Sequence, residues 1–237
     1  DLAARGLRDI RATQGPSALA GFGSAKGSNE EAYLFQKLVR TGFGSNNVDH
    51  CTRLCHASSV VALLEMIGSG AVSNPVQDVS KAEVVLIIGS NTTENHPVMS
   101  SSVKRAVTQK GTKLIVVDPR RIKITRYADM WLRQNLGTDV AWINGMIHVI
   151  IQENLYAKEY VENRTVGFEE VRQLVEKFTP EFVEEITGIP AREIVEAARL
   201  YAGAERGSIL YCMGITQHTT GTDNVKSLAN LAMLCGN

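Results

Sequence analysis

The sequence predicts an α/β fold, with a mostly parallel sheet and helices on both of its faces. Residues 84–88 are all apolar, which is typical of a strand that is covered on both faces. Strand-like and helix-like segments alternate after this run, and such alternation favours parallel strands joined by crossover helices. Glycine and polar residues follow several of the strands, where open parallel sheets bind their ligands.

The chain begins with segments that do not belong to this alternation. Apolar residues at helical spacing predict an amphipathic helix over residues 2–13, which Gly15 and Pro16 end. Residues 17–22 are short and apolar and predict a buried strand. A glycine-rich turn then leads into a helix over 29–40. Strand, glycine turn and helix is the form of a phosphate-binding loop, and an ordinary turn is the alternative.

Beyond residue 80 the strands and helices alternate regularly. We expect strands over 84–88, 113–117, 129–132 and 208–212, and helices over 97–109, 139–150, within 158–202 and over 223–234. Gly111 is a natural stop for the first of these helices. Asp139 and Asp223 are credible N-caps, and Pro180 and Pro190 fit the first turn of a helix.

Composition excludes several classes of function. The chain has 237 residues, with 25 Lys plus Arg against 25 Asp plus Glu, so no basic block indicates a nucleic-acid partner. No apolar run approaches the ~18 residues that cross a membrane. The four cysteines, Cys51, Cys55, Cys212 and Cys235, are scattered unevenly and do not resemble a disulfide framework. We therefore expect a reducing, cytoplasmic location.

Residues 46–67 hold the densest cluster of reactive side chains. In chain order they are His50, Cys51, Cys55 and His56. The cysteine spacing is one residue longer than the CxxC of zinc sites or the CxxCH of c-type haem attachment, and no second pair follows nearby, which disfavours both. A buried, packed cysteine and a reactive or metal-binding thiol both stay open on the residues alone.

A helix is predicted directly after these cysteines, over 58–67, with Ser58 or Ser59 as its N-cap. Cys55 and His56 then precede the first turn, where unpaired N–H groups and the positive end of the helix dipole lie. Such a position lowers the pKa of a thiol and prepares it to bind a metal or to act as a nucleophile.

Four strand ends carry residues suited to a nucleotide-bearing ligand. They are Gly89 to Glu94 after the first strand, Asp118 and Arg120 after the second, Gly137 to Asp139 after the third, and Met213 to Gln217 after the last. Glycines permit close backbone approach, Asp118 and Asp139 can hold ribose hydroxyls or a purine edge, and Arg120 can meet a phosphate. Each residue alone is more typical of a turn or cap, whereas the joint pattern favours a ligand.

Several separated stretches resemble molybdenum- or tungsten-dependent formate dehydrogenases, members of the molybdopterin oxidoreductase family. NNVDHCTRLCH is similar to their active-site segment. The stretches that follow in the same order are GSNTTENHP, VVDPRRIKITRYAD, NLGTDVAWINGMIHVIIQENLY and MGITQHTTGTDNVKSLANLAMLCGN. The likeness covers essentially all 237 residues and indicates an internal fragment of a catalytic (alpha) subunit. One departure is Ala57-Ser58, where many relatives have Gly-Pro, and it affects the helix start more than the chemistry.

The resemblance implies roles for individual residues. Cys55 would be the metal ligand, and His56 the neighbouring catalytic group that accepts a proton or stabilises charge, while Cys51 would not ligate. The implied cofactor is bis(molybdopterin guanine dinucleotide) with Mo or W. The residues implied to contact one of its arms are Lys26, Gly89, Asn91, Glu94, Asp118, Arg120, Gly137, Asp139, Met213, Gly214 and Gln217.

The resemblance also implies a domain plan and a reaction. Residues 1–55 would be a partial α/β segment of a neighbouring cofactor-binding domain, and residues 56–237 a Rossmann-like domain that binds molybdopterin guanine dinucleotide. Formate would be oxidised to CO2, with two electrons passing to the metal and on to electron-transfer subunits or domains. The 4Fe-4S domain, an active-site arginine and the domain for the other cofactor arm are expected outside this chain. The fragment alone is therefore expected to be inactive and can be cofactor-free.

Three other interpretations stay open. The first is another molybdopterin oxidoreductase, such as a nitrate reductase, although a His directly after Cys55 favours formate. The second is a non-catalytic scaffold subunit of a respiratory complex, against which the intact Cys55–His56 pair argues. The third is a plain NAD-binding Rossmann protein. The glycine turn near residue 23 lacks the acidic strand end about 20 residues on that such a site needs.

Overall fold

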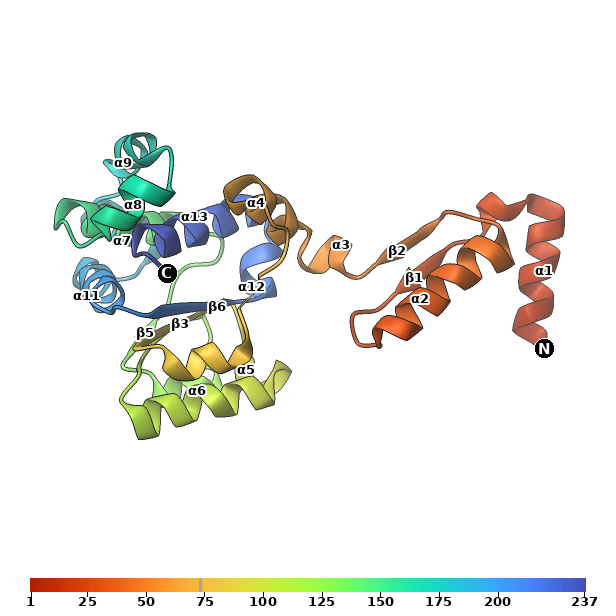
Figure 1. The fold of residues 1–237 in the computed structure, drawn as a ribbon, viewed down its shortest axis with the longest axis horizontal. Helices are drawn as coiled ribbons and strands as arrows, with labels where there is room; N and C mark the ends of the chain where they lie inside the picture. The colour runs from red at the N-terminus through yellow and green to blue at the C-terminus, as the bar shows by residue number, and fades with distance from the viewer. Residues whose placement is uncertain (73) are drawn as a thin grey trace. The chain divides into compact units, whose positions relative to one another are not determined.

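The computed structural model describes residues 1–72 and 74–237 (Figure 1). Within it the chain forms two compact units, residues 1–57 and residues 58–237. None of the helices in the described residues is long and apolar enough to cross a membrane.

The first unit contains a two-stranded parallel sheet. Its elements are α1 (Leu2–Gln14), β1 (Gly21–Gly23), α2 (Asn29–Lys37), β2 (Val48–His50) and α3 (Thr52–Cys55), with a 3-10 helix at Pro16–Ala18 and a π-helix at Leu38–Phe43. Strand β1 pairs with β2, with Gly21 opposite Val48. The predicted helices over 2–13 and 29–40 are confirmed. The buried strand predicted over 17–22 is confirmed only at residues 21–22, because Pro16 opens a 3-10 turn before it, and Phe22 is exposed rather than buried.

The N-terminus of α2 is capped by side chains of its own first turn. The Ser28 hydroxyl accepts from the Glu31 amide at 3.2 Å, and the Glu31 carboxylate accepts from the Ser28 amide at 2.6 Å. This reciprocal pair is a capping box. Because these donors are already bonded, the glycine-rich turn before α2 fits an ordinary turn better than a phosphate-binding loop.

The second unit is built on a four-stranded parallel sheet. Its strands are β3 (Val84–Ile88), β4 (Lys113–Val117), β5 (Met130–Leu132) and β6 (Gly207–Tyr211). Its helices are α4 (Ala57–Ile67, whose first residue falls in the first unit), α5 (Thr92–Asn95), α6 (Pro97–Lys110), α7 (Asp139–Gln152), α8 (Lys158–Arg164), α9 (Phe168–Val175), α10 (Pro180–Thr187), α11 (Ala191–Ala202), α12 (Met213–Thr216) and α13 (Gly221–Leu234), with 3-10 turns at Val76–Lys81 and Lys123–Tyr127.

The order of the strands places the predicted ligand edge. Across the sheet they run β5-β4-β3-β6, and every neighbouring pair is parallel. Numbered within this sheet the order is 3-2-1-4, as in the first four strands of a doubly wound α/β sheet. The chain therefore changes direction between β3 and β6, and such a switch point is where ligands bind beyond the strand ends. The predicted parallel α/β fold is confirmed.

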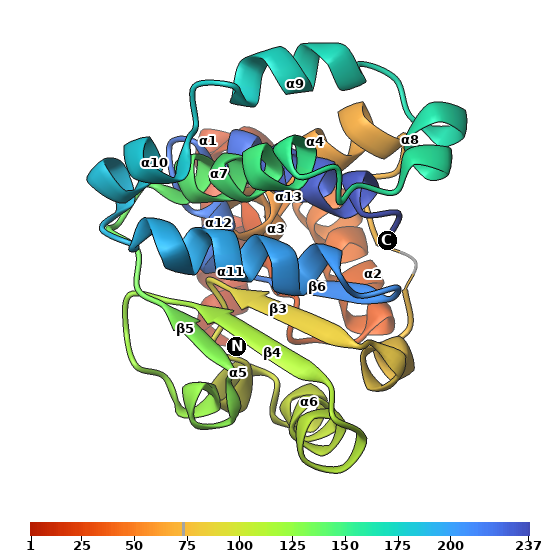
Figure 2. The same cartoon turned by 90° about the vertical axis from the view of Figure 1, so that its left-hand side faces the viewer.

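Helices cover both faces of the sheet, which explains the unbroken apolar run of β3. Figures 1 and 2 show α7, α11 and α13 on one face and α6 on the other. Successive side chains of a strand point to opposite faces. Leu86 accordingly joins the cluster beneath α7, α11 and α13, while Ile87 joins the cluster beneath α6.

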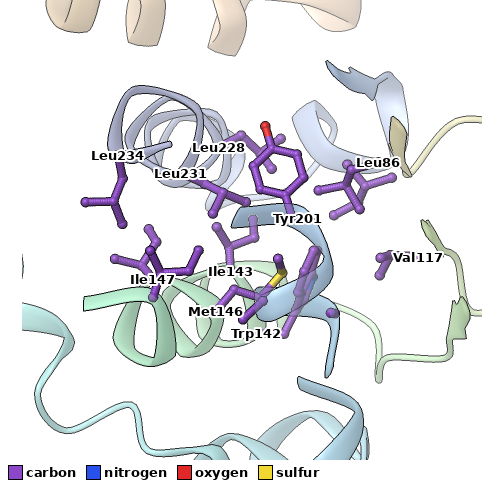
Figure 3. Close-up of a cluster of buried hydrophobic side chains, with 14 of the residues drawn as sticks. Leu86, Val117, Trp142, Ile143, Met146, Ile147, Tyr201, Leu228, Leu231 and Leu234 are labelled. Atoms are coloured by element: carbon purple, nitrogen blue, oxygen red, sulfur yellow. The ribbon is translucent and has the colours of Figure 1, made fainter. Parts of the chain in front are cut away.

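The larger cluster fixes the helix that starts beside the ligand edge. Figure 3 shows side chains of α7 and α13 packed against each other and against Tyr201 of α11. The buried members from α7 are Trp142, Ile143, Met146 and Ile147, and those from α13 are Leu228, Leu231 and Leu234. Because α7 is buried along one whole side, its first residue, Asp139, is held firmly at the sheet edge.

The structure corrects the predicted start of α4. This helix begins at Ala57, so neither Ser58 nor Ser59 is its N-cap. Their hydroxyls bond instead to β6 and to α12, which follows it. Ser58 Oγ donates to the Thr216 carbonyl at 3.2 Å, and Tyr211 Oη donates to Ser59 Oγ at 3.0 Å. The two serines, which local capping rules assign to the N-cap, make tertiary hydrogen bonds instead.

Three other predicted helix starts are shifted. Thr138 and Thr220 are the N-caps of α7 and α13, so Asp139 and Asp223 lie within the first turns. Both aspartates still complement the positive end of the helix dipole there. Pro190 occupies the N-cap position of α11 rather than its first turn, whereas Pro180 begins α10 as predicted.

Truncation of the central strand tests this core. Leu86→Ala removes a fully buried side chain between the sheet and its helices and is expected to lower the free energy of unfolding by about 2–5 kcal/mol. Val98→Ala on α6, where the side chain is 81% exposed, should change it by less than about 0.5 kcal/mol. Denaturant unfolding of both variants measures the difference, and equal effects would contradict the described core.

Candidate functional site

A cavity of about 280 Å³ lies at the carboxyl ends of the strands in the second unit. Its lining comes from the loops after all four strands and from the first residue of α7. The lining residues are Gly89, Ser90, Asn91, Asn95, Asp118, Pro119, Arg120, Gln134, Leu136, Gly137, Asp139, Cys212, Met213, Gly214 and His218. Most of the predicted contacts thus meet in one place, as the parallel topology requires.

Two glycines form the wall of the cavity at the switch point. Gly89 follows β3 with a φ of 56°, and a Cβ there would lie 2.7 Å from the carbonyl carbon of Gly214. A Cβ on Gly214 would lie 2.5 Å from the Gly89 Cα. The Gly214 amide donates to the Gly89 carbonyl at 3.0 Å. Only glycines allow the two loops to approach this closely. The predicted approach of these glycines to a ligand is a different contact and stays a prediction.

Asp118 organises the loop after β4. Its side chain is buried, and one carboxylate oxygen accepts from the Arg120 amide at 2.8 Å. The Trp131 indole donates to the Asp118 carbonyl at 2.9 Å and ties this loop to β5. The loop is therefore held by these hydrogen bonds, and it places Arg120 in the lining of the cavity.

Asp139 is the most buried carboxylate of the cavity, with 3% of its surface exposed. Gln134 Nε2 donates to its Oδ1 at 3.3 Å, and His218 Nε2 lies 3.9 Å from its Oδ2. Burial raises the pKa of the Asp139 carboxyl, while His218 and Gln134 act in the opposite direction. Burial dominates, so the pKa of the Asp139 carboxyl lies above that of an ordinary exposed aspartate.

Glu94 and Gln217 do not line the cavity, although both were predicted as contacts. Glu94 Oε2 accepts from the Asn91 side-chain amide at 3.0 Å, and Lys123 lies 3.3 Å from its Oε1. Since a carboxylate only accepts, Glu94 fixes which end of the Asn91 amide is the donor. It acts on the cavity through Asn91. Lys26 belongs to the first unit.

Sequence reasoning missed several cavity residues, of which Gln134 and His218 matter most. Both flank Asp139. Gln134 is the second residue after β5, so the strand-end argument used for the other loops could have found it. His218 follows Gln217 directly, but its side chain reaches the cavity only because α12 turns the chain back towards Gly214. Spacing in the sequence gives no signal of that turn.

The segment from His50 to His56, which holds Cys51 and Cys55, lies in the first unit. Cys55 ends α3, a helix of one turn that begins after Cys51. The Cys55 amide donates to the Cys51 carbonyl at 3.0 Å, and the His56 amide to the Thr52 carbonyl at 3.1 Å. The predicted unpaired amides belong to the first turn of the following helix, which begins at Ala57, whereas the amides of Cys55 and His56 themselves are bonded. Both amides donate to carbonyls at the start of α3, a short helix that the sequence pattern does not reveal.

Two residues that line the cavity carry buried acceptors without a protein partner. The side-chain oxygens Asn91 Oδ1 and Gln134 Oε1 are buried and have no hydrogen-bond partner among the described residues. Buried acceptors of this kind are costly unless a ligand donor satisfies them. Gly137 adopts a φ of 77° with open space where a Cβ would stand, which leaves room beside the mouth of the cavity. These residues fit a polar ligand with N–H donors.

The glycine contact gives a direct test of the cavity wall. Gly111→Ala, at a φ of 76° with open space around it, should cost about 1–2 kcal/mol from backbone strain alone. Gly89→Ala adds overlap with the Gly214 backbone and should cost about 1–3 kcal/mol more. Thermal unfolding of the two variants compares them, and a smaller loss for Gly89→Ala than for Gly111→Ala would contradict the close approach.

Comparison with known proteins places the chain in a family. The family model described as molybdopterin oxidoreductase matches residues 1–237. The chain is 48% identical over 222 residues to the F420-dependent formate dehydrogenase 1 subunit alpha of Methanococcus maripaludis, covering 94% of this chain and 33% of that relative. It is 45% identical over 232 residues to formate dehydrogenase H of Escherichia coli, covering 98% of this chain and 32% of that relative.

Among solved structures, acetylene hydratase from Pelobacter acetylenicus resembles the chain with a TM-score of 0.81 and 32% sequence identity, covering 99% of this chain and 32% of that one. The chain spans about a third of the length of these relatives. Because the family model matches the whole chain, and its α/β fold agrees with that structure, the chain belongs to the molybdopterin oxidoreductase family.

Proposed function

We propose that this chain is part of the catalytic subunit of a molybdenum- or tungsten-dependent formate dehydrogenase. The observation that carries the proposal is the convergence of the predicted contacts on one cavity, in a chain 45–48% identical to formate dehydrogenase alpha subunits. The cavity then binds the dinucleotide part of one arm of a bis(molybdopterin guanine dinucleotide) cofactor. Residues 1–55 and residues 56–237 belong to two domains, and each domain contributes residues that bind the cofactor.

The residues of the cavity divide the binding among themselves. Gly89 and Gly214 hold the loops after β3 and β6 together, and this contact shapes the wall against which the ligand lies. Arg120 supplies positive charge for a phosphate, since a guanidinium forms strong paired hydrogen bonds with phosphate oxygens. Asp118 and Asp139 offer carboxylate acceptors to ribose hydroxyls and to the N–H donors of a base edge.

Three predicted contacts keep a proposed role although they do not line the cavity. Glu94 orients the Asn91 amide. Lys26 contributes a positive charge from the first unit, and Gln217 stands beside the Met213–Thr216 helix whose first residues line the cavity. These assignments rest on the likeness to the family and on the position of each residue in the chain.

Cys55 and His56 carry the proposed chemistry. The cofactor, when bound, supplies a redox-active Mo or W centre that accepts two electrons from formate. The Cys55 thiolate is the protein ligand of that metal, because a soft anionic sulfur suits such a centre. His56 accepts a proton or stabilises charge beside it, since imidazole titrates near neutral pH. Cys51 does not ligate the metal.

The proposed partners follow from the same assignment. Formate is the substrate, and electrons leave through a 4Fe-4S domain and further subunits outside this chain. The relative from Methanococcus maripaludis is named as a subunit alpha, which supports a multisubunit assembly. We propose a cytoplasmic location from the scattered cysteines. The lower identity of 32% to acetylene hydratase makes a hydration reaction a weaker candidate than formate oxidation.

Substitution of Cys55 tests the reaction in the full-length protein. Cys55→Ala should lower formate-dependent dye reduction more than about 100-fold, because loss of a direct metal ligand exceeds the loss seen for outer-shell groups. Cys51→Ala, one helical turn away, should keep activity of the wild-type order. Elemental analysis of Mo and W on the same samples separates loss of the metal from loss of chemistry.

The same samples distinguish the alternatives. Metal-loaded wild type that is inactive with formate but reduces nitrate would replace the formate assignment with a nitrate reductase-like one. Wild type that holds neither Mo nor W, under conditions that load a known molybdoenzyme, would contradict the enzyme assignment and favour a scaffold subunit.

A further inference from the structure

Helix α3 carries a cysteine at each end. Cys51 is its N-cap residue, with helical dihedral angles of φ −58° and ψ −21°, and Cys55 is its last residue. The Cys55 amide donates to the Cys51 carbonyl at 3.0 Å, which is the bond of a regular helical turn. Residues four apart in such a turn lie on one face, with Cα atoms roughly 6 Å apart. That separation lies within the range that a disulfide spans.

His50 places a base beside the first of these cysteines. The Thr52 amide donates to His50 Nδ1 at 3.1 Å, and since an amide N–H only donates, this ring nitrogen carries no proton. The Thr52 hydroxyl lies 2.8 Å from the same nitrogen, and Cys51 Sγ lies 3.8 Å from it. A thiol beside an unprotonated imidazole nitrogen can pass its proton there and act as a nucleophile. Cys51 is also exposed in this chain, so a small molecule can reach its sulfur.

The other two cysteines differ from this pair. All four cysteines of the described residues are thiols, but neither Cys212 nor Cys235 has a second cysteine near it in the sequence. Burial also raises the pKa of the Cys235 thiol to about 12, which leaves little thiolate at neutral pH. Residues 50–55 thus combine two thiols and a base within about one helical turn.

We propose that Cys51 and Cys55 form a reversible disulfide in the cofactor-free protein, and that this bond keeps Cys55 from binding the metal until a thiol reductant opens it. The metal in this inference rests on the proposed function, whereas the disulfide rests on the geometry of α3 alone. In a regular turn the Cβ atoms of such a pair lie about 5–6 Å apart, farther than the ~3.8 Å of an unstrained disulfide. The bond must therefore tighten α3, and this strain makes it easy to reduce.

The oxidant is a small-molecule disulfide, of which oxidised glutathione is one. The Cys51 thiol gives its proton to His50 Nδ1, and its sulfur attacks one sulfur of this molecule, whose S–S bond breaks. One small thiol leaves with that proton, and Cys51 is left in a mixed disulfide. The Cys55 sulfur then attacks the Cys51 sulfur, and the second small thiol leaves with the Cys55 proton. The two cysteines lose two electrons in all, and the small disulfide gains them.

Digestion with trypsin reports the disulfide, because Arg53 lies between the two cysteines. Cleavage after Arg53 places Cys51 in residues 41–53 and Cys55 in residues 54–81, with no other cysteine in either peptide. Cofactor-free full-length protein is treated with oxidised glutathione, alkylated and digested. The two peptides should be found joined, and dithiothreitol should separate them. Peptides that are separate without reduction, whether alkylated or carrying glutathione, would overturn the proposal.

Three variants assign the steps. Cys55→Ser removes the second thiol, so the reaction should stop at a mixed disulfide of Cys51 with glutathione. His50→Gln should slow formation of the joined peptides by about tenfold or more, because it removes the proton acceptor. Cys212→Ser is the matched control and should form them at the wild-type rate. Slow formation in Cys212→Ser, or a wild-type rate in His50→Gln, would contradict the assignment.

Metal uptake separates this inference from the proposed function. Reduced and oxidised protein are offered molybdenum cofactor released from a known molybdoenzyme, and bound Mo is measured by elemental analysis. Oxidised protein should lose most of the uptake of reduced protein, and dithiothreitol should restore it. Equal uptake by both would overturn the effect of the disulfide on Cys55. Joined peptides in a protein that binds no metal when reduced would count against the proposed function alone, whereas normal uptake without joined peptides would overturn this inference alone.

Discussion

The close approach of Gly89 and Gly214 is the constraint on which the site depends. Strands β3 and β6 are neighbours, and the loops that leave their carboxyl ends meet through a hydrogen bond of 3.0 Å between these two glycines. A Cβ at either position would overlap with the backbone of the other glycine and push the two loops apart. The contact closes one wall of the cavity and sets where α12 begins, and with it the place of His218.

Burial determines the properties of Asp139, the cavity residue at the start of α7. Helix α7 packs along the sheet through Trp142 and its neighbours, so its first residue stands at the edge of the core rather than in solvent. A carboxylate in that position, Asp139, is costly unless charges and donors compensate it. Gln134 and His218 supply part of that compensation, and a ligand with N–H donors would supply more. The same packing that stabilises the fold therefore prepares the site.

The sequence predicts the four strands of the second unit well, because each has a pattern that can be recognised along the chain, whereas β1 is predicted only in part and β2 not at all. The unbroken apolar run of β3 indicates a doubly covered strand, and the residues after each strand converge as parallel topology demands. Helix starts are predicted less well, since tertiary bonds compete with local capping, as for Ser58. Two site residues are missed for different reasons. Gln134 follows β5 closely, so the strand-end argument could have found it, whereas His218 reaches the cavity through the turn of α12, which no spacing along the chain encodes.

The central claim is that the strand-end cavity holds a guanine dinucleotide arm of a metal-bearing pterin cofactor. Acid extraction of the purified, active full-length protein, followed by chromatography of the released nucleotides beside Mo and W analysis, tests it most directly. The account predicts guanosine monophosphate as the released nucleotide, in a fixed ratio to Mo or W. Release of an adenine nucleotide, or of no nucleotide from protein that carries the metal, would contradict it.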